Sequence, residues 1–315
     1  MLEALRMDSS KGSASYLVLI TLQFPTMTKP HHWIANLNDF GLIKVSGDKT
    51  LEFLQGQLTC DVKQLKEHEA SLGACCNPKG RMMANFYIWR DSKNDCYLLL
   101  PQSIVLPTIN HLKKYAVFSK VTLTALKKMI VEIAGDLTLE KKTSATVIRI
   151  PSLQTETSTH LIIADPKASA TLYKNIAAKI PPIDALTWHA FNIQNGLGFI
   201  YPQTQELFTP QMINLEKQGG VSFKKGCYVG QEIIARTEYL GKLKRHLYRA
   251  HVDCESMPQP GDELNNKNEQ TVGIVVEAAP AENKGFDVLA VLQDQMLEKD
   301  PQIYYQGCEL VIARL

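Results

Sequence analysis

The sequence lacks the short patterns that mark several large enzyme classes. It contains no P-loop, no GxGxxG after a predicted strand, no GxSxG and no HExxH. The common nucleotide-binding, lipase-like and metalloprotease functions are therefore excluded. Long apolar runs are lacking too: residues 16–24 form the longest run near the start, whereas a membrane-spanning helix needs roughly 18–20 residues. We expect no membrane insertion.

Cysteines are few, and their spacing suits neither disulfides nor a metal. The seven cysteines contain no CxxC pair and are widely scattered, at Cys60, Cys75, Cys76, Cys96, Cys227, Cys254 and Cys308. An odd number of scattered thiols is typical of a reducing compartment and predicts a cytoplasmic protein. The neighbours Cys75 and Cys76 rarely converge on one ion, and His31 and His32 are distant in sequence, so we expect no metal site.

A strong net charge is also absent, since 34 basic and 32 acidic residues leave only +2. Any attraction for polyanions must therefore be local. The stretch 224–249 holds seven basic and two acidic residues, a local charge of +5. A solvated strand face is one explanation. The alternatives are an anion channel for phosphates or a polycarboxylate tail, and an RNA contact that includes Tyr239 and Tyr248.

Length and composition predict a folded chain with several domains. The chain has 315 residues, of which 45% are hydrophobic and 21% charged, and a domain usually holds about 100–200 residues. We expect an N-terminal extension over 1–27, which need not be native, and two α+β domains over 28–126 and 127–240. Short apolar runs that alternate with Gly, Pro and Asn turns predict a β-barrel over 241–315.

Strand and helix signals are mixed before residue 240, which indicates the α+β class. Apolar alternation and β-branched residues predict strands over 39–47, 84–90, 96–100, 129–134 and 161–164. Helical spacing of apolar residues behind a capping residue predicts helices that begin near Asp48, Ser103, Asp165 and Asp184.

The stretch GGVSFKKGCYVGQEIIAR contains the strongest candidate for chemistry. Its Cys227 lies between Gly226 and Gly230, which let a ligand approach the thiol closely. The ammonium groups of Lys224 and Lys225 precede the cysteine and favour its thiolate form, which is the nucleophile. A buried structural thiol is the alternative.

Trp188 is the second candidate. On the helix predicted from Asp184, an apolar stripe is formed by Leu186, Ala190, Ile193 and Leu197. Trp188 is two positions from Leu186, a rotation of roughly 200°, so we expect it to point away from this stripe. A large indole in that position either packs against another domain or stacks on a flat ligand.

Three segments carry a resemblance to a known family: FLQGQLTCDV (53–62), KKYAVFSKV (113–121) and KKGCYVGQE (224–232). They resemble the YgfZ family of folate-binding, tRNA-modification-associated proteins, which are related to the glycine-cleavage aminomethyltransferases. The resemblance extends from about Asn38 to the C-terminal barrel. It implies an aminomethyltransferase-like folate-binding fold, with two α+β domains and a C-terminal β-barrel around a central channel.

The resemblance also implies a site for tetrahydrofolate or a derivative such as 5-formyltetrahydrofolate. It assigns five cofactor-binding residues, Phe40, Trp188, Gln194, Tyr228 and Gln231, and it makes Cys227 and Lys225 the reactive pair. Phe40 stands where the family usually has Trp, so weaker stacking is expected. Gln194 stands where the aminomethyltransferases have Glu, and it brings no charge.

The function implied is an accessory role for iron–sulfur enzymes, including a tRNA thiomethyltransferase. One alternative is a folate-dependent one-carbon transferase of the aminomethyl type. It is disfavoured because Ala84 and Asn85 replace the Asp pair of those enzymes, and neither residue can move protons as a carboxylate does. A second alternative is a module that binds tRNA directly.

Overall fold

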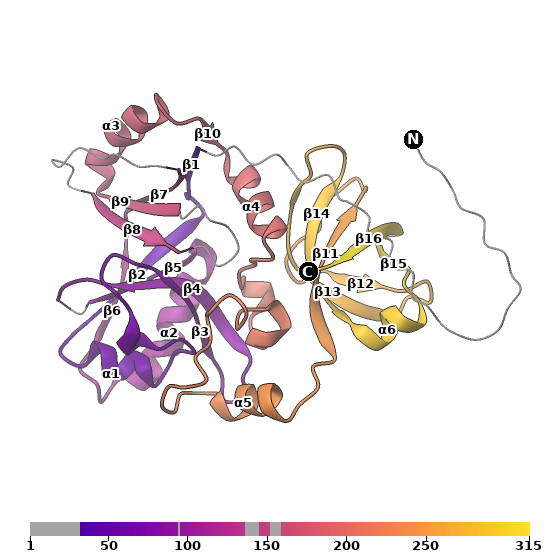
Figure 1. Cartoon of the computed structure of the whole chain (residues 1–315), viewed down its shortest axis with the longest axis horizontal. Coiled ribbons are helices and arrows are strands. Elements are labelled where there is room, and N and C mark those ends of the chain that lie inside the picture. Colours follow the sequence, from indigo (N-terminus) through magenta and orange to yellow (C-terminus); the bar gives the residue numbers. More distant parts are fainter. Residues whose placement is uncertain (1–31, 94, 136–144, 152–158) are drawn as a thin grey trace, which may run out of the picture.

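The computed structural model describes residues 32–93, 95–135, 145–151 and 159–315, and the predicted extension over 1–27 lies outside them. The described chain forms two five-stranded sheets and one closed barrel (Figure 1). The predicted α+β class with a C-terminal barrel is thus confirmed. No helix among the described residues combines the length and apolarity needed to cross a membrane.

The first sheet is antiparallel, with the strand order β3-β4-β5-β2-β6. Its strands are β2 (Phe40–Ser46), β3 (Ser71–Cys76), β4 (Met82–Arg90), β5 (Cys96–Pro101) and β6 (Thr122–Leu126). Helices α1 (Thr50–Gln55) and α2 (Val105–Ala116) accompany it, and α2 buries Ile109, Leu112 and Ala116. A capping role for Asp48 was wrong: Lys49 is the N-cap, and the Thr50 hydroxyl donates to the Gly47 carbonyl at 2.8 Å.

The second sheet has the order β10-β1-β7-β9-β8. Its strands are β1 (Trp33–Asn36), β7 (Met129–Ala134), β8 (Thr146–Ile150), β9 (Thr159–Ala164) and β10 (Pro182–Ile183). Helix α3 (Pro166–Ala177) follows β9, and helix α4 (Ala185–Gln194) follows β10. Strand β1 pairs with β7, so the chain contributes a strand to the second sheet before it forms the first sheet. Residues 33–36 therefore lie in the second sheet, although the sequence placed them in the first domain, 28–126.

The barrel closes in the order β11-β14-β13-β12-β15-β16. Its elements are β11 (Arg245–Val252), β12 (Glu263–Asn265), β13 (Thr271–Pro280), β14 (Phe286–Gln293), α6 (Asp294–Lys299), β15 (Ile303–Tyr305) and β16 (Cys308–Arg314). All of them lie inside the range expected for the barrel. Alternate residues of the strands point inward and fill it with aliphatic side chains and with Tyr248 and Tyr305, as a small barrel requires.

The segment between α4 and the barrel returns to the first sheet, although the sequence placed it in the second domain. It contains the short 3₁₀-helices η3 (Pro202–Thr204) and η4 (Pro210–Ile213), then α5 (Gln231–Tyr239), and its residues, all of them described, form no strand. The Met82 amide donates to the Phe208 carbonyl, and the Glu206 amide donates to the Met82 carbonyl, both at 2.9 Å. Residues 200–240 therefore belong structurally with the first sheet.

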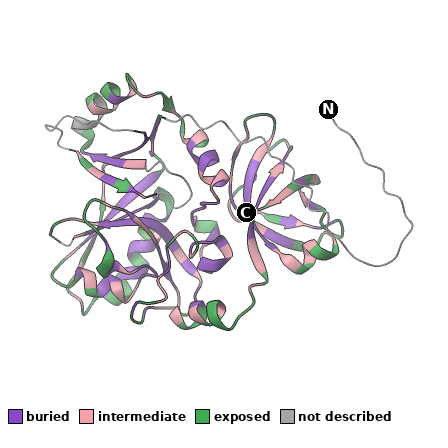
Figure 2. Ribbon diagram, in the orientation of Figure 1, coloured by how far each residue is buried: buried purple, intermediate pink, exposed green. Residues whose placement is uncertain are grey.

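Helix α4 lies between the second sheet and the barrel, and half of its residues, 188–191 and 193, are buried (Figure 2). Asp184 caps it as predicted, with the Thr187 amide donating to the carboxylate at 2.8 Å. Its contacts with β1, β13 and β14 join the second sheet to the barrel, and η4 makes a further contact with β11.

Candidate functional site

The structure brings together three segments that are distant in the sequence. Residues 56–60, the turn 77–80 and the stretch 220–233 pack against one another on the first sheet. Two of the three segments that carry the family resemblance thus meet at one place. We call this arrangement the Cys227 platform.

A buried lysine holds the platform together. The Lys225 ammonium donates to the carbonyls of Leu58 and Cys60, each at 2.7 Å, and the residue is 7% exposed. The ammonium also lies 5.0 Å from the ring centroid of Tyr228, a cation–π distance. Burial lowers the pKa of Lys225 to about 8, and electrostatic interactions with Cys60 and Asp61 oppose this effect. The amine therefore remains mostly charged at pH 7.

Backbone hydrogen bonds extend this attachment on either side of Lys225. The Ser222 amide donates to the Thr59 carbonyl at 2.9 Å, and the Thr59 hydroxyl donates to the Gly220 carbonyl at 2.6 Å. The Val229 amide donates to the Gly56 carbonyl at 3.2 Å. Residues 220–229 are consequently fixed along the first domain over their whole length.

Two glycines allow the platform to close. Gly230 has φ +84°, and a Cβ on it would lie 2.6 Å from the Asn77 carbonyl oxygen. Gly80, at φ +70°, would place a Cβ 3.1 Å from the Cβ of Ile233. Because only glycine adopts such angles at little cost, the turn and the start of α5 can approach this closely.

Cys227 is the exposed thiol of this platform. The described cysteines of the first sheet, Cys60, Cys75, Cys76 and Cys96, are buried, and Cys254 and Cys308 are half-buried. Burial raises the pKa of Cys60 to about 11 and those of Cys75 and Cys96 to about 12. These thiols are therefore protonated at neutral pH, whereas Cys227 is open to reagents and partners. The alternative of a buried structural thiol is wrong for Cys227.

The expected activation of Cys227 by Lys225 stays a prediction. The hydrogen bonds of the Lys225 ammonium go to Leu58 and Cys60, so its contacts in the described structure anchor the segment. Tyr228 and Gln231, expected to bind folate, help to build the turn before α5: the Tyr228 amide donates to the Gln231 side-chain oxygen at 3.3 Å. Tyr228 is buried, its hydroxyl has no hydrogen-bond partner among the described residues, and burial raises its pKa.

Trp188 differs from the expectation that it points away from the core. It is 1% exposed, while Leu186 of the predicted apolar stripe is 47% exposed. Helix α4 is covered on two sides: Ala190 and Ile193 belong to a core shared with the first sheet and the barrel, and Trp188 belongs to a core shared with β1, β2 and β7. Of the two alternatives, packing between domains is the observed one.

The polar edge of Trp188 and the ring of Phe40 are both engaged inside this core. The Trp188 indole donates to a Glu132 carboxylate oxygen at 2.8 Å. Phe40, 5% exposed, meets the indole edge-on with ring centroids 5.1 Å apart. The two aromatic residues expected to bind folate, Phe40 and Trp188, therefore contact each other, and Trp188 is closed off from solvent.

A charge cluster that the sequence did not indicate lies next to Trp188; its His189 and Glu277 are buried, and its Asp39 is exposed. The ring of His189 is held between two carboxylates, with Nδ1 2.5 Å from Glu277 of the barrel and Nε2 2.6 Å from Asp39 of the first domain. Glu277 also accepts from the Tyr201 hydroxyl at 3.1 Å and from the Phe199 amide at 3.1 Å. This cluster joins three parts of the chain at one point.

The two carboxylates keep His189 charged. Burial alone would lower the pKa of His189, but the hydrogen bonds and charges of Asp39 and Glu277 outweigh it and raise the pKa to about 10. At pH 7 the ring is therefore an imidazolium, and both of its N–H groups donate.

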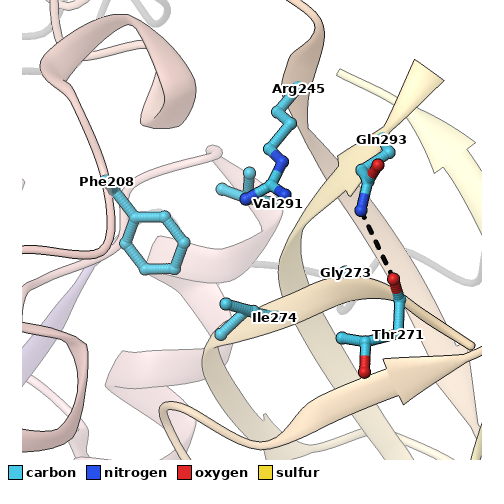
Figure 3. Close-up of a pocket in the computed structure, with 7 residues that line it drawn as sticks. All are labelled: Phe208, Arg245, Thr271, Gly273, Ile274, Val291 and Gln293. Carbon is cyan, nitrogen blue, oxygen red and sulfur yellow. Dashed lines mark hydrogen bonds between the residues drawn. The ribbon is translucent and has the colours of Figure 1, made fainter. Parts of the chain in front are cut away.

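The basic stretch 224–249 is not one continuous surface. Lys225 is buried in the platform, and Arg249 is buried in the barrel, 4.0 Å from Asp287. Arg245 instead lines a cavity of about 130 Å³ between the barrel and the segment that holds Phe208 (Figure 3). Burial and, to a lesser extent, the charge of Arg245 lower the pKa of Arg81, so two guanidinium groups lie near each other here.

The Arg245 cavity can take a small anion but not a whole cofactor. Pockets for drug-sized ligands usually measure about 300–1,000 Å³, well above the volume here. Its remaining lining residues are Phe208, Thr271, Gly273, Ile274, Val291 and Gln293. Ile274 is three residues before Glu277 on β13, about 10 Å along a strand. The cavity and the His189 cluster are therefore neighbours.

The positive φ of Gly230 gives the first prediction. Gly230→Ala forces a left-handed alanine and overlaps the Asn77 carbonyl, so we expect the free energy of unfolding to fall by roughly 2–4 kcal/mol in urea titrations. Gly226→Ala is the matched control, because a Cβ there meets nothing within 4 Å. It should change the free energy by less than about 0.5 kcal/mol. Equal effects of the two substitutions would contradict the close packing of the platform.

The raised pKa of His189 gives the second prediction. The stabilisation from His189 is fully present below its unfolded-state pKa near 6.5 and is lost as the pH rises through about 10. Between these values, the advantage of the wild type over His189→Gln should shrink by roughly 1.4 kcal/mol per pH unit in urea unfolding. A difference that stays constant from pH 7 to pH 10 would show that His189 is neutral in the folded protein.

Individual relatives, not a family model, show which family the chain belongs to. No family model matches it. The tRNA-modifying protein YgfZ of Blochmanniella pennsylvanica is 31% identical over 303 residues, 88% of this chain and 92% of that protein. The protein of the same name from Aliivibrio fischeri is 31% identical over 91% of this chain and 95% of its own length.

A solved structure supports the fold assignment. The glycine cleavage system aminomethyltransferase T from Bartonella henselae aligns with a TM-score of 0.69 over 91% of this chain and 86% of that protein, at 14% sequence identity. At that identity the match shows the shared fold. The sequence identity to the curated relatives, sustained over nearly the whole chain, shows that this protein belongs to the YgfZ family.

Proposed function

We propose that this protein is a cytoplasmic, folate-binding accessory protein that supports iron–sulfur enzymes and, through them, the thiomethylation of tRNA. The role in tRNA modification is supported by the name of its relatives, tRNA-modifying protein YgfZ. The observation that carries the proposal is the Cys227 platform, in which three distant segments present one exposed thiol. Cys227 is the reactive group, and a one-carbon unit, a sulfur or a cluster iron is what it would accept.

Folate would be tetrahydrofolate or a derivative such as 5-formyltetrahydrofolate, and the described residues fit it in part. The side-chain amide nitrogen of Gln194 is buried without a hydrogen-bond partner among the described residues, so it can donate to a pterin carbonyl. Arg245 in its cavity suits the carboxylate tail. Stacking on Trp188 requires Phe40 to turn away, because the two rings are in contact.

A folate-dependent aminomethyl transferase is the second candidate, and the shared fold favours it. Asn85 argues against it. Its side chain is fully buried, its amide group donates to the Gly198 carbonyl at 2.9 Å, and its oxygen accepts from the Ile200 amide at 2.8 Å. A side chain committed in this way joins β4 to the segment after α4, and it supplies no acid for one-carbon transfer.

Cys227 and Gln194 lie on different segments of the structure, and this gives the third prediction. Cys227→Ala should leave the affinity for 5-formyltetrahydrofolate within about twofold in calorimetric titrations, because truncating an exposed side chain away from the ligand changes little. The same variant should lose support for tRNA thiomethylation, measured as methylthiolated nucleosides in cells that lack their own copy of the gene.

Cys254→Ala is the matched control, since that thiol is half-buried on the barrel, away from the platform. It should keep both folate binding and thiomethylation. Full thiomethylation by Cys227→Ala would rule out the thiol role. Failure of the wild type to bind 5-formyltetrahydrofolate would rule out the folate role separately.

A further inference from the structure

The third segment of the family resemblance, KKYAVFSKV, contributes nothing to the Cys227 platform. It covers the end of α2 and the turn after it, at residues 113–120, which we call the α2 tip. Phe118 is 93% exposed, Val117 72% and Tyr115 37%. These are large apolar side chains that the fold itself does not bury, although soluble proteins normally keep such groups inside.

Buried side chains and a closed turn hold the α2 tip in place. Leu112 and Ala116 are buried against the first sheet. The turn after the helix is closed by the Ser119 amide, which donates to the Ala116 carbonyl at 2.9 Å. Lys120 then takes φ +52°, and its carbonyl packs against Gly47. The outward direction of the tip is thereby set by the fold.

The charged residues of the tip itself are all basic. From residue 96 to residue 131 the chain has five lysines and no Asp or Glu. Lys113, Lys114 and Lys120 lie in the tip, are exposed, and form no ion pair with any described residue. The exposed Asp48 follows Gly47, and its charge is offset by Lys49. The field at the tip therefore favours an anion.

Aromatic rings between unpaired lysines match the chemistry of single-stranded RNA. Unstacked bases bind to exposed aromatic faces, and lysines bind the phosphates between them. A protein partner that buried Phe118 and Val117 would also have to desolvate three like charges. We propose that the α2 tip binds a single-stranded loop of RNA, with a base stacked on Phe118 and phosphates on Lys113, Lys114 and Lys120. The proposal rests on the tRNA side of the proposed function.

The test uses the full chain and a fluorescein-labelled tRNA stem-loop with an unmodified loop, measured by anisotropy. Phe118→Ala should weaken binding roughly tenfold, because base stacking on one aromatic ring contributes about 1–3 kcal/mol. Tyr239→Ala is the matched control: that ring is 67% exposed on α5, outside the tip, and its loss should leave the affinity unchanged. Phe118→Ala should also keep the thermal unfolding temperature, since the side chain is hardly buried.

Salt dependence identifies the lysines. The double variant Lys113→Ala/Lys114→Ala should reduce the slope of log K against log salt by about 1.4, since each phosphate contact on single-stranded nucleic acid contributes about 0.7. Lys242→Ala/Lys244→Ala, exposed residues in the basic stretch 224–249, should keep the wild-type slope.

Three results would overturn the proposal. The first is no binding of the stem-loop by the wild type at low salt. The second is a slope changed by the Lys242/Lys244 pair and not by the Lys113/Lys114 pair. The third is unchanged RNA affinity in a Phe118→Ala variant that no longer supports thiomethylation, which would indicate a protein partner. Folate titration separates this proposal from the proposed function. Folate binding without RNA binding would contradict RNA binding by the α2 tip and leave the folate role intact.

Discussion

The position of Cys227 depends on one buried ammonium group. Lys225 donates to two carbonyls of the first domain and forms no ion pair with a described acidic residue. Those hydrogen bonds must therefore offset the cost of removing its charge from water. The charge of the lysine is used to hold the backbone of a long, strand-poor segment on the first domain. Because Lys225 and Gly230 are fixed, Cys227, which lies between them in the sequence, is held in one place at the surface.

The interior at Trp188 is closed, and this changes how a ligand could reach it. Trp188, Phe40 and Phe199 pack on one another, and the His189 cluster joins the first domain, α4 and the barrel beside them. Opening this core would separate an imidazolium from two carboxylates. The Arg245 cavity is lined by Ile274, which lies on the same strand, β13, as Glu277 of this cluster. Under the proposed function, a folate could stack on Trp188 only if Phe40 moved aside, because the two rings are in contact.

Local signals in the sequence predicted the elements well, and long-range packing explains what they missed. The barrel, the cap at Asp184 and the start of α3 after Asp165 follow from turn residues and capping chemistry, which act over a few positions. The predicted direction of the Trp188 side chain was right in part, since Trp188 lies on a different side of α4 from Ala190 and Ile193. The periodicity of apolar residues within α4 does not reveal that other parts of the chain cover the helix on both sides.

The site needed contacts that no local pattern contains. His189 meets Asp39 and Glu277 across 150 and 88 positions of sequence, and the Lys225 ammonium meets Leu58 across 167. The family resemblance identified Cys227 and Lys225 as important, but the neighbours of Lys225 in sequence suggested a role at the thiol, while its side chain extends into the first domain. Strand β3, SLGACC, gave no strand signal, because its small residues and thiols show no alternation of polar and apolar residues, and its last four residues are all buried.

Hydrogen exchange at the Val229 amide tests the anchoring by Lys225 most directly. Lys225→Met keeps the length of the side chain and removes both hydrogen bonds, whereas Lys224→Met alters the exposed neighbour. If Lys225 holds the platform, Val229 and Ser222 should lose protection in Lys225→Met and keep it in Lys224→Met. Wild-type protection of both amides in Lys225→Met would show that the segment is held without the lysine, and would contradict this account of how Cys227 is presented.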